Sequence, residues 1–162
     1  MIIAHDDNSV IKQLSCGSDH SCFLTEHGDV YACGENQKGQ LGLGFNSPKE
    51  YRPLRVQIKD LTRDDYITQV ACGAYHTLFL SDKQKVYGVG LNDFGQLGLG
   101  QEENLNSATL VSELSDKGIN SISAGESSYG LSSEGKLYVW GLFDKTINTK
   151  PQVIESIQKP IK

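Results

Sequence analysis

Residues 16–44 of this chain read CGSDHSCFLTEHGDVYACGENQKGQLGLG, and residues 72–100 read CGAYHTLFLSDKQKVYGVGLNDFGQLGLG. The two stretches align without an insertion at a constant offset of 56 residues (72 − 16). A shorter third copy, AGESSYGLSSEGKLYVWG, occupies residues 124–141. Self-similarity at such a period is typical of propellers, solenoids and other repeat arrays, in which each repeat is one supersecondary unit. The repeat, rather than any single residue, therefore determines the fold.

Each copy predicts short strands joined by tight turns. Residues 21–25 and 30–33 are apolar at consecutive positions, which favours strands covered on both faces, as in stacked propeller blades. The loop at residues 39–44 (GQLGLG) alternates glycine with leucine, so we expect its leucines to fill a pocket between neighbouring blades. In the second copy of this loop Gly98 is expected to hold a positive φ, which glycine adopts cheaply. Gly118 is expected to be an ordinary linker residue.

The expected strands make three four-stranded antiparallel units. The three inner strands of each unit are expected at residues 10–16, 21–25 and 30–33, at residues 67–72, 76–80 and 85–90, and at residues 119–124, 129–131 and 136–141. The outer strands are expected at residues 53–58, 108–114 and 151–154. The sequence thus predicts an all-β fold of three antiparallel blades of a β-propeller. Because closed propellers have about 4–8 blades, the ring is expected to be incomplete in this chain.

The repeats also suggest a division of the chain. We expect an N-terminal arm at residues 1–9, three repeats over residues 10–157 (about 10–65, 66–117 and 118–157) and a C-terminal tail at residues 158–162. Terminal units of repeat arrays normally need a polar cap, yet both end units carry apolar strand residues, namely Val10, Ile11 and Leu14 in the first and Ile119, Ile122, Leu137 and Val139 in the third. Three arrangements stay open: part of a longer propeller, a homo-oligomeric ring, or a partner that covers the ends. The repeat boundary at the end of the sequence favours the first.

Composition argues against several functional classes. A net charge of −5 disfavours direct nucleic-acid binding, which needs clustered Lys and Arg. No apolar run approaches the ~20 residues that span a bilayer, and residues 1–10 lack the basic and apolar regions of a secretory signal. The four cysteines lie in apolar, strand-like settings, which indicates buried thiols rather than a disulfide framework. We expect an intracellular location, in the cytoplasm or the nucleus.

No catalytic, metal or cofactor site is predicted. His20 and His76 recur at one repeat position before apolar residues, so we expect a hydrogen-bonded structural role rather than catalysis. A zinc site is conceivable from four side chains of the first repeat, Cys16, His20, Cys22 and Cys33. The second repeat keeps only two of these positions, and no C-x-x-C pair exists. The glycine-rich loop lacks the Lys-Ser/Thr ending of a nucleotide-binding loop. The chain is therefore predicted not to be an enzyme.

These residues resemble the repeats of the regulator of chromosome condensation family, whose pattern contains V-A-C-G-x-x-H-T-L, V-Y-x-W-G and N-x-x-G-Q-L-G. The second repeat carries this pattern in residues 69–73, 76–78, 86–87 and 92–98, and the first in residues 16–17, 20, 30–31, 36 and 39–44. The third ends on Trp140-Gly141 but departs at Ser128, where the family has His, and lacks the glycine–leucine loop. The resemblance covers about residues 10–157 and implies a seven-bladed propeller with four-stranded blades.

The resemblance implies a binding function. Family members include guanine-nucleotide exchange factors for small nuclear GTPases and proteins that bind chromatin, ubiquitin-pathway or ciliary partners. In the exchange factors, the turn between the repeat's Gly and His faces the GTPase; carried over by position, the partner-binding residues are Ser18, Asp19, Ala74, Tyr75, Glu126 and Ser127. Two hypotheses follow: a protein-interaction module that binds a protein partner through one mouth of the propeller, or a regulator of a small GTPase such as an exchange factor. For each position the alternative is a solvated turn residue without a partner.

Overall fold

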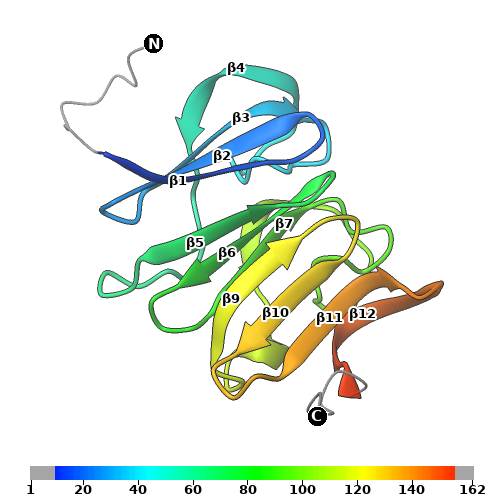
Figure 1. The fold of residues 1–162 in the computed structure, drawn as a ribbon. Coiled ribbons are helices and arrows are strands. Elements are labelled where there is room, and N and C mark those ends of the chain that lie inside the picture. Colours follow the sequence, from blue (N-terminus) through cyan, green and yellow to red (C-terminus); the bar gives the residue numbers. More distant parts are fainter. Residues whose placement is uncertain (1–9, 156–162) are drawn as a thin grey trace.

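The computed structural model describes residues 10–155, and every regular element in that range except one short 3₁₀ helix is a β-strand. The strands form three four-stranded antiparallel sheets that follow one another along the chain (Figure 1). The predicted all-β fold of three antiparallel blades is confirmed. The arm expected at residues 1–9 and the tail expected at residues 158–162 lie outside the described residues.

Each sheet contains four strands that are consecutive in the sequence. The first sheet comprises β1 (Ile11–Cys16), β2 (His20–Thr25), β3 (Val30–Asn36) and β4 (Ser47–Arg55). The second comprises β5 (Ile67–Cys72), β6 (His76–Ser81), β7 (Val86–Gly90) and β8 (Leu105–Leu110), followed by the 3₁₀ helix η1 (Ser112–Leu114). The third comprises β9 (Ile119–Ala124), β10 (Ser128–Ser132), β11 (Leu137–Phe143) and β12 (Thr146–Val153). The leading strands β1, β5 and β9 contact one another in that order.

The outer strands lie earlier in the chain than the sequence predicted. The strand expected at residues 53–58 is β4, which ends at Arg55. The amide of Val56 still donates to the Val30 carbonyl of β3 (2.8 Å), but that of Gln57 donates to the Gly42 carbonyl in the glycine–leucine loop (3.3 Å), where the chain leaves the sheet. The strand expected at residues 108–114 is β8, and η1 occupies the end of that range. In the third sheet β12 begins at Thr146 rather than near residue 151. The expected outer-strand positions were therefore wrong by several residues.

Two apolar cores fill the spaces between the sheets. The first core includes Leu24 and Val30 from the first sheet, Leu41 from the glycine–leucine loop, and Val70, Phe79 and Tyr87 from the second sheet. The second core includes Leu78, Leu80 and Val86 from the second sheet and Ile119, Ile122, Tyr138 and Trp140 from the third. Every residue of β6 is buried, because successive side chains point to opposite faces and each face is covered by another sheet. The prediction that the repeated strands are covered on both faces holds in this middle sheet. It was wrong for residues 21–25 and 30–33 of the first sheet, where Phe23 and Tyr31 are only half-buried because no sheet covers their face.

The glycine–leucine loops close the gaps between blades as expected. Leu41 and Leu97 are fully buried at equivalent positions of the two loops. Gly98 has a φ of +73°, and a Cβ built there would lie 2.9 Å from Cδ1 of Trp140, so only glycine fits. Gly118 also has a positive φ, +65°, and the interpretation of this residue as an ordinary linker glycine was wrong.

The end sheets differ from the expectation of two bare apolar faces. On the first sheet the side chain of Leu14 is 66% exposed, and Val10 and Ile11 are also exposed, as predicted. In the third sheet, by contrast, Ile119, Ile122 and Val139 are buried. The two isoleucines face the second sheet and belong to the second core. The prediction for the third sheet was therefore wrong for these three residues, and only Leu137 is half-buried.

Candidate partner-binding site

The turns that join the first and second strands of the three sheets lie along one edge of the fold. We call this edge, formed by residues 17–19, 73–75 and 125–126, the mouth. Backbone hydrogen bonds tie the three turns together: the amide of Ser18 donates to the carbonyl of Ala74 (3.2 Å), and the amide of Ala74 donates to that of Gly125 (2.9 Å). The mouth is therefore one continuous surface held by main-chain contacts rather than three separate loops.

Four of the six residues predicted to bind a partner are exposed at the mouth. They are Ser18, Asp19, Tyr75 and Glu126. The ring-bearing side chain of Tyr75 is 40% exposed, a large apolar area for a residue in a turn. Ala74 is half-buried, because both of its main-chain polar groups bond to the neighbouring turns. The expected turns thus come together in space, although their side chains are not equally available.

Ser127 differs from the others, because it is only 6% exposed and its hydroxyl donates to the carbonyl of Leu142. The third turn is one residue shorter than the other two. Gly73 donates to the carbonyl of His76, whereas Gly125 donates to that of Ser127, each over 2.8 Å. Ser127 therefore occupies the buried histidine position, and its side chain is not exposed at the mouth.

The same shortening corrects the interpretation of Ser128. Ser128 pairs with Trp140 in the sheet, as Thr77 pairs with Val89 in the preceding one. Ser128 is thus the equivalent of Thr77 rather than of the family's histidine. The deletion lies in the turn, where it removes one exposed position from the mouth.

The two histidines are structural. His20 Nε2 lies 2.9 Å from the hydroxyl of Thr77, and that hydroxyl donates to the carbonyl of Gln40 (2.8 Å). Because a hydroxyl has one hydrogen to donate, Thr77 accepts from His20, which fixes the Nε2–H tautomer. His76 is almost fully buried, and burial first, with the nearby His20 imidazole second, lowers the pKa of His76 to about 3. A neutral, buried imidazole that bonds the next blade has a structural role, as its repeat position predicted.

The four cysteines are free thiols, but the expectation that they are buried was wrong for two of them, because Cys16 is exposed and Cys33 is half-buried at the uncovered side of the first sheet. Cys22 is fully buried, and its pKa is raised well above the usual range by its hydrogen bond with Cys72 and then by burial. The thiol of Cys72 donates to the carbonyl of Ser15 (3.4 Å). Within residues 10–155 no group of three or more His, Cys, Asp or Glu side chains is placed to hold a metal ion. That the chain binds no metal stays a prediction.

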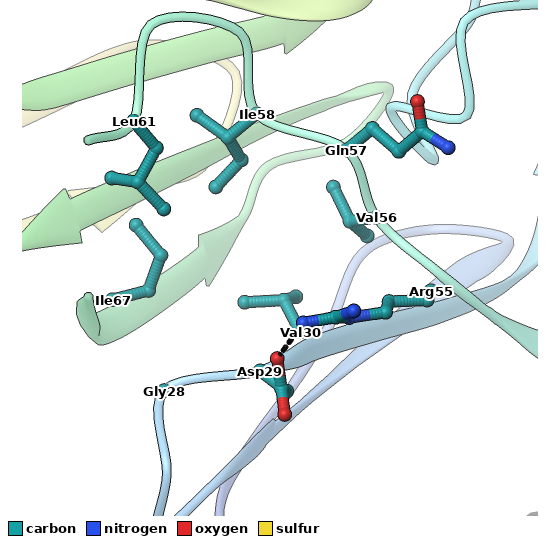
Figure 2. Close-up of a pocket in the computed structure, with 9 residues that line it drawn as sticks. All are labelled: Gly28, Asp29, Val30, Arg55, Val56, Gln57, Ile58, Leu61 and Ile67. Atoms are coloured by element: carbon teal, nitrogen blue, oxygen red, sulfur yellow. Dashed lines mark hydrogen bonds and ion pairs between the residues drawn. The ribbon is translucent and has the colours of Figure 1, made fainter. Parts of the chain in front are cut away.

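One hollow lies between the first two sheets, among the turn at Gly28, the end of β4 and the link that follows it (Figure 2). Its volume is about 340 Å³, and the apolar side chains of Val56, Ile58 and Leu61 line it opposite an ion pair between Arg55 and Asp29. Ile58, which lines this hollow, is only half-buried, whereas Leu114, at the equivalent position 56 residues later on η1, is completely buried in the second core. We therefore interpret this hollow as loose packing of the link at residues 56–66.

A second hollow opens at the mouth, between the second and third sheets. This mouth pocket has a volume of about 240 Å³ and is lined mainly by Tyr75, Leu91, Phe94, Glu126 and Leu142. Tyr75 and Glu126 are among the residues predicted to bind a partner, whereas Leu91, Phe94 and Leu142 were not predicted. Phe94 stands where the first repeat has Lys38, and this change of residue type within an otherwise faithful repeat is the signal that could have pointed to it.

The fold and its repeated inter-blade contacts define a protein built from propeller blades. The sequence profile of the regulator of chromosome condensation (RCC1) repeat matches residues 27–80 and 84–129, and a second profile of that repeat matches residues 11–40 and 67–96. The chain belongs to the regulator of chromosome condensation repeat family. Among residues 10–155 no helix has the length and apolar character needed to cross a membrane.

Similar proteins include longer chains of several kinds. The human X-linked retinitis pigmentosa GTPase regulator is 38% identical over 136 residues, which cover 83% of this chain and 13% of that protein. The human E3 ubiquitin-protein ligase HERC2 is 32% identical over 159 residues, 91% of this chain and 3% of that protein. The chain thus spans a small fraction of these curated relatives.

Solved structures show the same architecture. The crystal structure of human WBSCR16 matches with a TM-score of 0.81 and 26% identity, over 93% of this chain and 39% of that one. Yeast RCC1 (Prp20), solved with Kap60, matches with a TM-score of 0.77 and 22% identity, over 90% of this chain and 37% of that one. Three blades here thus correspond to part of a larger propeller, and the ring is incomplete.

Proposed function

We propose that this chain is a protein-interaction module that binds a protein partner through its mouth. The observation that supports this proposal is the main-chain linkage of the three turns, which holds Ser18, Asp19, Tyr75 and Glu126 on one surface. These side chains differ between the turns, whereas the strands beneath them repeat closely. Exposed, variable residues on a rigid scaffold are where binding functions concentrate.

A charge-reversal experiment tests the proposal. The mouth variant carries Asp19→Lys and Glu126→Lys, and its control carries Glu26→Lys and Glu134→Lys in the exposed hairpin turns that join the second and third strands. Both double variants change the net charge by the same amount. Partners captured by the wild type are compared by quantitative mass spectrometry, and each candidate is then tested with purified protein. We expect the mouth variant alone to lose a partner, and equal retention by both variants would refute the proposal.

Regulation of a small GTPase is the second candidate. It is supported by the name of the relative that is 38% identical, a GTPase regulator, of which this chain covers only 13%. An exchange factor binds the nucleotide-free GTPase, so release of a fluorescent GDP analogue from a panel of small GTPases is the appropriate measurement. Acceleration that is lost in the mouth variant would favour this candidate over a module without exchange activity.

We further propose that the chain itself carries no catalytic activity. One similar protein is named a ubiquitin ligase, yet this chain corresponds to 3% of it. An intracellular location, in the cytoplasm or the nucleus, is also proposed, and the four free cysteines are consistent with a reducing compartment. Direct nucleic-acid binding is not proposed, because the net charge is −5.

A further inference from the structure

The mouth pocket combines apolar walls with one free carboxylate. The side chains of Tyr75 and Phe94 are 40% and 44% exposed, and Leu91 and Leu142 are half-buried beside them. Glu126 closes the pocket from the third sheet, and among residues 10–155 no Lys, Arg or His forms an ion pair with it. The pocket therefore offers aromatic and aliphatic contact together with an unneutralised negative charge.

Hydrogen bonds hold the backbone segments that carry the walls of this pocket before any ligand arrives. The amide of Leu91 donates to the carbonyl of Tyr75 (2.9 Å), which joins the turn to the loop that follows β7. The amide of Phe94 donates to the side-chain oxygen of Gln96 (2.9 Å) in the same loop. A preorganised pocket spends little ordering entropy on binding. The floor is formed by His76, which is neutral near pH 7 because burial lowers its pKa to about 3.

The repeat itself does not require these residues. At the positions equivalent to Tyr75, Leu91 and Phe94, 56 residues earlier, the first repeat carries Asp19, Glu35 and Lys38. The first interface closes with the same histidine–hydroxyl contact although these three positions are charged. Exposed aromatic and aliphatic side chains at the second interface thus have no evident role in packing the blades.

We propose that the mouth pocket binds an arginine side chain of the protein partner. Its aliphatic stem would lie against Leu91 and Leu142, its planar guanidinium would face the Tyr75 and Phe94 rings, and Glu126 would accept its hydrogen bonds. Arginine fits better than lysine, because the guanidinium stacks on aromatic faces and donates two parallel hydrogen bonds to a carboxylate. This inference rests on the proposed function and specifies which chemical group of the partner the mouth recognises.

The test uses the full chain and a pair of small probes. N-acetyl-arginine methylamide and the matching citrulline compound have nearly the same shape, but only the first is charged. Amide shifts of the ¹⁵N-labelled protein are followed as each probe is added. We expect the arginine compound to bind at least about fivefold more tightly than the citrulline compound, with shifts centred on residues 74–76, 91–96 and 126. Equal binding of the two probes, shifts elsewhere, or no binding would overturn the inference.

Variants identify the groups responsible. Glu126→Gln should reduce the preference for arginine to less than about twofold, whereas Glu134→Gln, at an exposed acid in the hairpin turn between β10 and β11 and outside the mouth, should leave it unchanged. Phe94→Lys, which introduces the first repeat's residue type, should abolish binding, and a thermal melt verifies that it remains folded. An unchanged preference in Glu126→Gln would exclude the assigned pocket.

The two proposals can fail separately. If the probe does not bind but the mouth variant still loses its partner, the interaction module stands and the arginine pocket is wrong. If the probe binds as expected but the mouth variant keeps every partner, the pocket chemistry stands and the mouth is not the partner-binding surface.

Discussion

His76 on β6 donates from Nε2 to the hydroxyl of Ser128 on β10 over 2.7 Å, and this hydroxyl donates to the carbonyl of Gln96 over 2.7 Å. One chain of hydrogen bonds thereby joins β6 of the second blade, β10 of the third blade and the glycine–leucine loop at Gln96. The first interface has the same arrangement, with His20 and Thr77 in the equivalent places. The histidines of the first two repeats therefore bond to the following blade, and their partners are the hydroxyls of Thr77 and Ser128 at one sheet position.

The buried state of His76 predicts acid sensitivity. Its pKa is about 3 in the folded chain, against about 6.5 when unfolded, so the unfolded state takes up a proton first as the pH falls. The stabilisation is fully present above pH 6.5 and decreases between pH 6.5 and 3, by up to ~1.4 kcal/mol per pH unit for this one group. Urea unfolding at several pH values between 7 and 4.5 measures this slope.

The control separates His76 from the carboxylates that also titrate in acid. His76→Gln removes the titrating ring, so its free energy of unfolding should depend less steeply on pH between 6.5 and 5 than that of the wild type. The exposed His27 provides the matched variant His27→Gln, which leaves the buried His76 ring, and therefore its contribution to the slope, in place. If the free energy of unfolding depends equally steeply on pH in all three proteins, the assignment of this slope to His76 is wrong.

Ser128→Ala should destabilise the chain by about 1–3 kcal/mol, because it leaves the Nε2–H of buried His76 without an acceptor. Ser128→Thr keeps the hydroxyl that serves in the first interface and should recover part of this loss. Ser133→Ala, an exposed serine next to the same sheet, is the control. Chemical unfolding measures all three, and a loss in Ser133→Ala as large as in Ser128→Ala would argue against the hydrogen-bond chain.

Gly73 and Gly125 occupy one repeat position in different surroundings. A Cβ at Gly73 would lie 2.2 Å from Cε1 of His76 and 2.6 Å from the carbonyl oxygen of Gly125, whereas a Cβ at Gly125 has no neighbour within 4 Å. Gly73→Ala should therefore cost about 1–3 kcal/mol and Gly125→Ala less than about 0.5 kcal/mol. Neither residue has a positive φ, so the difference in stability between the two variants reports the steric contacts of the added methyl group rather than backbone strain. Similar melting temperatures for the two variants would show that the turns rearrange freely.

The sequence predicted the inner strands well because two copies that align without an insertion indicate the same strand positions. β5 begins and ends where expected, at Ile67 and Cys72. The outer strands were misplaced because β4 and β8 are only partly covered, so they lack a continuous apolar signature. Tyr31 and Tyr87 show a further limit of repeat reasoning: Tyr87 is buried, whereas Tyr31 is half-buried because no sheet covers its face.

The candidate site was only partly predictable for similar reasons. The shortened third turn can be aligned in two ways, and the sequence alone did not distinguish a deletion before Ser127 from one after Ser128. The partners of the histidines are equally hidden, since the Thr77 and Ser128 hydroxyls lie 57 and 52 residues further along the chain. The mouth pocket escaped prediction because Leu91 and Leu142 look like ordinary core residues until the fold places them at an edge.

The uncovered face of the first sheet supports a prediction about association. Leu14, Phe23 and Tyr31 are cross-strand neighbours on this face, and in the second sheet their equivalents Val70, Phe79 and Tyr87 are buried against the first sheet. A face that is a blade-to-blade interface elsewhere in the same chain should be covered by another blade, a second copy or a partner. The isolated chain should therefore self-associate at micromolar concentration or bind an apolar dye.

A matched pair of substitutions tests this. Leu14→Glu, at a side chain that is 66% exposed, should leave the fold intact while reducing light scattering and dye binding. Val70→Glu makes the same change at the equivalent position of the second sheet, where it places a carboxylate in the first core, and should prevent stable folding. A wild-type chain that is a monodisperse monomer without dye binding, and a Leu14→Glu variant indistinguishable from it, would show that this face is stable in water without a cover.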